Sequence, residues 1–148
     1  MVYGIIGENC SGKSTLAEEI TKTVKAEIIT GRDYLKMARN EHEAVRLFKE
    51  KLHDAVSGDN VIYVISEREQ AELLPDGAVR ILVKADIDTI RERFRNRMHG
   101  SLPAPVEKML VKKHGMFDEG TYDYIFDSTK DNPADLCEKL SGQLQADK

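Results

Sequence analysis

The sequence has few cysteines, no long hydrophobic run and no excess of positive charge. Its two cysteines, Cys10 and Cys137, lie far apart and form no C-x-x-C pair, which argues against a disulfide framework and for reduced thiols. No stretch is long and apolar enough for a membrane span, and no basic, apolar leader precedes the first hydrophobic run. We therefore expect a cytoplasmic protein with no membrane partner.

Positive charge is confined to one cluster. The 22 Lys and Arg residues are outnumbered by 26 Asp and Glu residues, for a net charge of −4, which disfavours a nucleic acid polymer as partner. The four histidines are scattered, with no Cys or Asp at metal-ligand spacing. A chain of 148 residues that is 41% hydrophobic can build one full core, so we expect a single domain over residues 1–148.

The most informative stretch present is Gly7–Ser14, which matches G-x-x-x-x-G-K-[ST]. It follows a short apolar run typical of a buried strand and precedes a helical pattern, which is the context of a phosphate-binding loop. Backbone N–H groups of such a loop bind phosphate oxygens, its lysine reaches the β- and γ-phosphates, and its serine ligates Mg²⁺. The predicted ATP site comprises Gly7, Glu8, Asn9, Cys10, Ser11, Gly12, Lys13, Ser14 and Thr15, with Ser14 as the metal ligand.

Strand and helix patterns alternate along the chain, and no internal repeat is present. The expected strands are residues 2–6, 27–30, 61–65, 79–83 and 122–126. The expected helices are residues 13–25, 34–57, 69–74, 89–98, 106–117 and 133–144, the last beginning at Pro133 after an Asp131 or Asn132 cap. This alternation predicts an α/β fold, a three-layer sandwich with a five-stranded parallel sheet.

Charged residues follow the expected strands, at the sheet edge where ligands bind. Arg93 and Arg97 lie four residues apart on one helix face, and arginines so placed stabilise the charge of a phosphoryl group in transfer. Glu67 is a candidate to hold Mg²⁺ through water or to orient the acceptor, and Arg68 a candidate to bind an acceptor phosphate. Asp33 is likewise a candidate to hold Mg²⁺ or orient the acceptor, and Arg32 a candidate to bind an acceptor phosphate. Asp33 is a candidate general base only if the acceptor is a hydroxyl.

Two other classes of phosphate-loop protein are disfavoured. The guanine-binding N-K-x-D of small GTPases is absent. A transporter-like Leu-Ser-Gly-Gln occurs at residues 140–143, but on the last helix, with no strand after it.

The arrangement resembles the nucleoside and nucleotide monophosphate kinase family of P-loop proteins over nearly the whole chain. Residues 28–31 with Asp33 resemble the start of the monophosphate site in adenylate kinases, and residues 66–68 resemble the acid–arginine pair of thymidylate and deoxynucleoside kinases. Asp86 followed by Arg93 and Arg97 resembles the family's lid. The resemblance implies the strand order 2-3-1-4-5, a short lid around residues 91–105, and Ser128 and Thr129 near the adenine. It implies acceptor binding by Thr30, Gly31, Arg32, Asp33 and Arg68.

The sequence departs from the family in its short lid and in lacking D-G-F-P-R after the third strand. Our main prediction is a kinase that transfers the γ-phosphoryl group of ATP to a nucleotide or nucleoside, acting as a monomer or homodimer. Lys13, Arg93, Arg97, Asp33 and Glu67 are its candidate catalytic residues. Two alternatives stay open: a kinase of a small hydroxyl metabolite of the shikimate or gluconate kind, and a nucleotide-binding regulatory module without transfer activity.

Overall fold

The computed structural model describes residues 1–146, with side chains as far as residue 142. The last two residues of the predicted 1–148 domain therefore lie outside the described part. Five strands form one sheet in the order β2-β3-β1-β4-β5, with every neighbouring pair parallel. They are β1 (Val2–Ile6), β2 (Glu27–Thr30), β3 (Val61–Ile65), β4 (Val79–Lys84) and β5 (Tyr124–Asp127). The predicted strand order is confirmed.

The strand sequences explain their places in the sheet. Every residue of β1 and β3 is buried, as expected for continuous apolar runs in the centre of a parallel sheet. The edge strands β2 and β5 are more exposed. β5 begins two residues later than predicted, because the Asp123 carboxylate turns back to accept a hydrogen bond from the Arg80 backbone at 2.8 Å.

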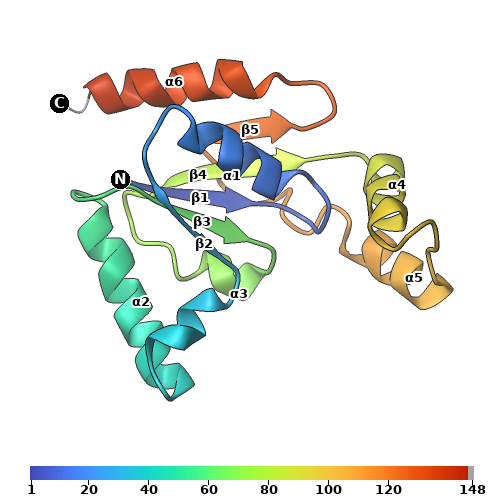
Figure 1. Cartoon of the computed structure of the whole chain (residues 1–148), viewed down its shortest axis with the longest axis horizontal. Helices are drawn as coiled ribbons and strands as arrows, with labels where there is room; N and C mark the ends of the chain where they lie inside the picture. Colours follow the sequence, from blue (N-terminus) through green and yellow to red (C-terminus); the bar gives the residue numbers. More distant parts are fainter. Residues whose placement is uncertain (147–148) are drawn as a thin grey trace.

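Helices cover both faces of the sheet (Figure 1). The helices α1 (Lys13–Thr21) and α6 (Pro133–Ala146) pack on one face, through a core that includes Leu16, Ile20 and Leu140. The helices α2 (Glu41–Ala55) and α3 (Arg68–Ala71) lie on the other. The helices α4 (Ile87–Arg97) and α5 (Ala104–Lys113) form a pair beyond the carboxyl ends of the strands. None of the helices in residues 1–146 is long and apolar enough to cross a membrane.

The long helix predicted over residues 34–57 is wrong. A 3₁₀ helix, η1 (Asp33–Met37), comes first, and α2 begins only at Glu41. The Asn40 side chain accepts a hydrogen bond from the Glu43 N–H at 2.8 Å and so caps the start of α2. Tyr34 of η1 stacks on Phe48 of α2, with ring centroids 4.9 Å apart. This aromatic contact folds η1 back onto α2, a tertiary effect that helix periodicity does not reveal.

Candidate active site

The phosphate loop leaves the central strand β1 at the carboxyl edge of the sheet. Gly7 N–H donates to the Ile65 carbonyl at 3.1 Å, which continues the sheet pairing into the loop. A Cβ at Gly7 would lie 2.6 Å from the Val83 carbonyl oxygen, so only glycine fits between the strands there. Gly12 has φ +108° and Cys10 has φ +63°. The predicted strand, glycine loop and helix are therefore all present.

Two polar groups are buried inside this loop. Lys13 is only 7% exposed, and its Nζ donates to the Glu8 backbone carbonyl at 2.6 Å. Burial lowers the pKa of Lys13 to about 8; the nearby Glu8 and Glu67 carboxylates act in the opposite direction. The Ser11 hydroxyl is buried with no hydrogen-bond partner in the described part of the chain. A buried polar atom without a partner is costly in free energy, so the loop is suited to an anion that supplies one.

Arg93 ties the phosphate loop to its surroundings. Its Nη1 donates to the Cys10 carbonyl and to the Ser128 hydroxyl oxygen, each at 3.0 Å. Ser128 in turn donates to the Lys84 carbonyl at 3.2 Å. A Cβ at Gly12 would lie 2.9 Å from the Ser128 Cβ. The structure thus brings Ser128 against the loop, while Thr129 donates its hydroxyl to the Asp127 carboxylate at 2.5 Å.

Arg97 lies one turn further along α4 and behaves differently. Its side chain is exposed and forms no hydrogen bond within the described residues. Its charge lowers the pKa of Lys13, so the guanidinium is close enough to the phosphate loop to act on that lysine. Of the predicted arginine pair, Arg93 is engaged by the loop and Arg97 is free to meet a ligand.

The predicted acceptor residues Thr30, Gly31, Arg32 and Asp33 run from the last residue of β2 to the first residue of η1. The Tyr63 hydroxyl donates to the Gly31 carbonyl at 2.7 Å and holds the turn against the sheet. The pKa of Tyr63 is raised, mainly by burial and to a smaller extent by the nearby Tyr34 and Asp33. Arg32 lies 3.3 Å from the Glu41 carboxylate, while Asp33 is exposed and forms no hydrogen bond to other described residues.

Glu67 and Arg68 are both bound by the end of α5. The Glu67 carboxylate is 2.9 Å from Lys113 Nζ. Arg68 donates to the Met116 carbonyl through Nε at 3.2 Å and Nη2 at 2.8 Å. These two predicted residues are therefore brought to the carboxyl edge, but the protein itself occupies their polar groups.

Sequence reasoning missed a contact between the phosphate loop and residues more than 100 positions away. The Glu8 carboxylate binds His114 Nδ1 at 2.9 Å and accepts from the Gly115 N–H at 3.1 Å. The motif alone predicts Glu8 as a donor-site residue, and His114 has no motif around it. No local signal in the sequence pairs them, because the contact depends on how α5 folds over the sheet edge.

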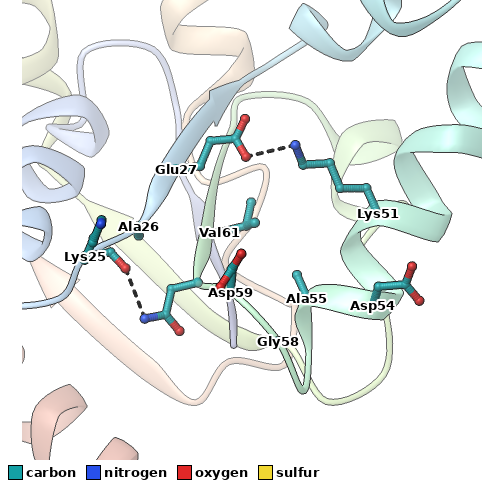
Figure 2. A pocket seen from close by; sticks show the side chains of 10 residues that line it. Lys25, Ala26, Glu27, Lys51, Asp54, Ala55, Gly58, Asp59 and Val61 are labelled. Atoms are coloured by element: carbon teal, nitrogen blue, oxygen red, sulfur yellow. Dashed lines mark hydrogen bonds and ion pairs between the residues drawn. The ribbon is translucent and has the colours of Figure 1, made fainter.

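A hollow of about 930 Å³ lies elsewhere, at the amino ends of β2 and β3. Figure 2 shows polar side chains on its walls, among them Lys51, which pairs with Glu27 at 2.8 Å. The Asn60 side chain donates to the Lys25 carbonyl at 3.1 Å. Ligands of parallel α/β sheets bind at the carboxyl ends of strands. The hollow is at the opposite end of the strands from the phosphate loop and belongs to a different surface.

The described residues contain no cluster of three or more His, Cys, Asp or Glu that could hold a metal ion. Ser14 is exposed at the second residue of α1. A metal ion bound here would be coordinated by Ser14 together with oxygens of a bound ligand, rather than by protein side chains alone.

Comparison with known proteins identifies the fold. No family model and no curated protein matches the sequence. Many solved structures resemble the chain, and those described here do so over almost its whole length. An uncharacterized protein from Eubacterium ventriosum aligns at TM-score 0.68 and 14% identity, covering 98% of both chains. A shikimate kinase from Bacteroides thetaiotaomicron aligns at 0.61 and 15%, also covering 98% of both.

A gluconokinase from Sinorhizobium meliloti aligns at TM-score 0.60 and 16% identity, covering 99% of this chain and 97% of that one. With the strand order and the phosphate loop, these likenesses define the class: the chain has the three-layer α/β fold of P-loop NTPases, in the form found in small P-loop kinases. Its predicted resemblance to P-loop kinases is confirmed at the level of fold.

Proposed function

We propose that this protein is an ATP-dependent kinase of a small molecule. The observation that carries the proposal is the buried Lys13 beside the Ser11 hydroxyl, which has no partner among the described residues, inside a loop whose Gly12 adopts φ +108°. Both groups gain partners when phosphate oxygens enter the loop, and the N-terminus of α1 adds its positive dipole. The donor site of the proposal is the loop from Gly7 to Ser14, with Ser128 against it.

The residues also fit Mg²⁺ bound together with the triphosphate. In this proposal Ser14 supplies one oxygen, and Glu67, whose charge acts on Lys13, reaches the ion through water. When bound, Mg²⁺ neutralises charge on the β- and γ-phosphates. The chain's own contribution is Lys13 and Arg97, which place two positive charges about the transferring group, while Arg93 holds the loop and Ser128 in position.

A short lid over residues 91–105 is part of the proposal. It contains most of α4 and its connection to α5, where Gly100 has φ +92° and no neighbouring atom within 4 Å of a Cβ built there. A left-handed glycine in open space is a suitable point for a bend. Movement of this segment would bring Arg97 over the phosphates and exclude water.

For the acceptor, we favour a small hydroxyl metabolite over a nucleotide, which reverses the preference drawn from sequence. Arg68, the expected ligand of an acceptor phosphate, is engaged by Met116. Asp33 offers a carboxylate that makes no hydrogen bond within the described residues and could accept a hydroxyl proton. The solved structures named shikimate kinase and gluconokinase are in keeping with this choice.

A panel of acceptors tests the proposal, with release of ADP as the measurement. Hydroxy acids and sugar acids should stimulate ADP release in the presence of Mg²⁺, and nucleoside monophosphates and nucleosides should not. A signal from nucleotides alone would restore the nucleotide kinase. Tight ATP binding with no transfer to any acceptor would favour the regulatory module.

Asp33→Asn separates the two kinase readings. With a hydroxyl acceptor it should lower kcat by about 10²- to 10⁴-fold, the usual contribution of a general base, and change acceptor KM little. With a nucleotide acceptor, Arg32→Ala or Arg68→Ala should instead raise acceptor KM. Lys36→Ala, an exposed neighbour on η1, is the matched control.

A further inference from the structure

The segment of residues 113–116, at the end of α5, is bound at four points to the carboxyl edge of the sheet. Lys113 pairs with Glu67, His114 and the Gly115 N–H both bind Glu8, and the Met116 carbonyl accepts from Arg68. The segment therefore engages the donor loop and both predicted acceptor residues after β3. We call residues 113–116 the latch.

The latch leaves no room for an acceptor between itself and the phosphate loop. The space enclosed by Glu8, Asn9, Ser66, Ile90, Leu110, Lys113 and Met116 is about 10 Å³, about the least that holds one water molecule. A sugar acid or a nucleoside needs far more space than that. An acceptor that enters this space, or that takes the Glu67 oxygen bound by Lys113, must therefore displace the latch.

Glu8 makes the closed arrangement favourable while no triphosphate is bound. Its side chain is only 14% exposed, and a carboxylate so far removed from water is costly unless its oxygens are hydrogen-bonded. Both oxygens are satisfied by the latch, Oε1 by His114 and Oε2 by Gly115. Opening the latch breaks both hydrogen bonds, and water must then replace them.

The same residue connects the latch to the donor site. The Glu8 backbone carbonyl accepts the Lys13 Nζ hydrogen bond at 2.6 Å, and the Glu8 carboxylate is close enough to act on the charge of Lys13. Triphosphate oxygens compete with this carbonyl for Lys13, and their negative charge repels the carboxylate. A ligand shifts an equilibrium only by binding one state better, and here the triphosphate favours the state in which Glu8 has moved.

We propose that residues 113–116 are a latch that closes the acceptor side in the free protein, and that donor binding releases it through Glu8. This inference rests on the proposed kinase function. It implies an order of binding, with the triphosphate first and the acceptor second. It also reverses the common behaviour of a lid, because the donor loosens this segment rather than closing it.

Amide hydrogen exchange followed by NMR tests the latch without any acceptor. In the free protein the Gly115 amide should be protected, and the double variant Lys113→Ala/His114→Ala should exchange it at least about tenfold faster. Lys112→Ala, an exposed neighbour that takes no part in these bonds, should leave the rate unchanged. Equal Gly115 exchange in the double variant and the wild type would overturn the latch.

A non-hydrolysable ATP analogue with Mg²⁺ tests the coupling. It should shift the Gly12 and Lys13 amide signals and speed exchange at Gly115 by about tenfold. Shifted loop signals with unchanged or slower exchange at Gly115 would overturn the release. Absence of any shift in the loop would instead refute the proposed function, and the double variant would still decide whether the latch exists.

Once an acceptor is known, its KM should fall in the double variant; a higher KM would place Lys113 in the acceptor site and overturn the latch.

Discussion

Arg93 Nη1 lies 3.0 Å from the carbonyl oxygen of Cys10, so the first arginine of the predicted pair binds the protein's own phosphate loop. The same nitrogen reaches Ser128 after β5. The two arginines, four residues apart on α4, therefore differ: Arg93 fixes the phosphate loop, and in the proposed function Arg97 is available to the transferring group.

This division predicts different consequences for the two alanine variants. Arg93→Ala should lower the free energy of unfolding by about 1–2 kcal/mol, because it removes hydrogen bonds from a half-buried guanidinium, and should weaken ATP binding. Arg97→Ala should leave thermal stability unchanged and lower kcat by about 10³- to 10⁵-fold. Thermal unfolding and steady-state kinetics measure the two effects. Arg95→Ala, exposed on the same helix, should change neither; equal loss of stability in all three variants would contradict the division.

Lys13 predicts a pH dependence of nucleotide binding. Burial lowers its pKa to about 8, so the free protein loses this positive charge as the pH rises through that value. Bound phosphates favour the charged form and raise the pKa again. ATP affinity should therefore fall above about pH 8, and binding at that pH should take up about half a proton.

Calorimetry in buffers of different ionisation enthalpy measures this proton uptake. At about pH 7, where Lys13 is already mostly charged, the uptake should fall to about a tenth of a proton. Equal uptake at both pH values would show that another group titrates.

Gly12 should tolerate no side chain. Alanine there would hold φ +108° and place its Cβ 2.9 Å from the Ser128 Cβ. Strain of this kind costs about 1–3 kcal/mol, and the loop's N–H groups would leave their phosphate-binding positions. We expect Gly12→Ala to lose ATP binding in a direct titration.

Gly142 is a matched control for that variant, since it lies in α6 and no atom of the described part of the chain is within 4 Å of an added Cβ. Gly142→Ala should raise stability by up to about 1 kcal/mol and bind ATP normally. Normal binding by Gly12→Ala would refute our account of the loop.

Tyr63→Phe tests the turn after β2. Loss of the hydroxyl removes the hydrogen bond to Gly31, where φ is +54°. The expected cost is about 1 kcal/mol of unfolding free energy, with a higher KM for the acceptor and an unchanged KM for ATP. Tyr124→Phe is the control on the edge strand; the same rise in acceptor KM in both variants would argue against a role for this turn.

The sequence predicts best what is local or strongly patterned. β1, β2 and β3 have the predicted bounds, because apolar runs closed by Gly7, Gly31 and polar residues leave little freedom. The phosphate loop is equally clear, since its spacing is dictated by the ligand. Prediction is wrong at residues 34–57, where stacking of Tyr34 on Phe48 and the Asn40 cap overrule helix periodicity.

The acceptor side depends on contacts that no spacing encodes. Glu67 and Arg68 are correctly predicted to follow β3, but their partners come from the end of α5, 46 and 48 residues further along the chain. The structure places α5 beyond the sheet edge (Figure 1), and only that placement brings His114 to Glu8. The roles assigned to these residues stay predictions.

The hollow at the amino ends of β2 and β3 offers a site for labelling or immobilising the protein. Both native thiols are buried, and Asp59 is an exposed residue of that hollow. A cysteine introduced there would be the accessible one for a maleimide dye or a surface tether. The five residues of β3 separate it from the phosphate loop by about 17 Å. A dye or tether attached at Asp59 would therefore leave the phosphate loop accessible to ligands.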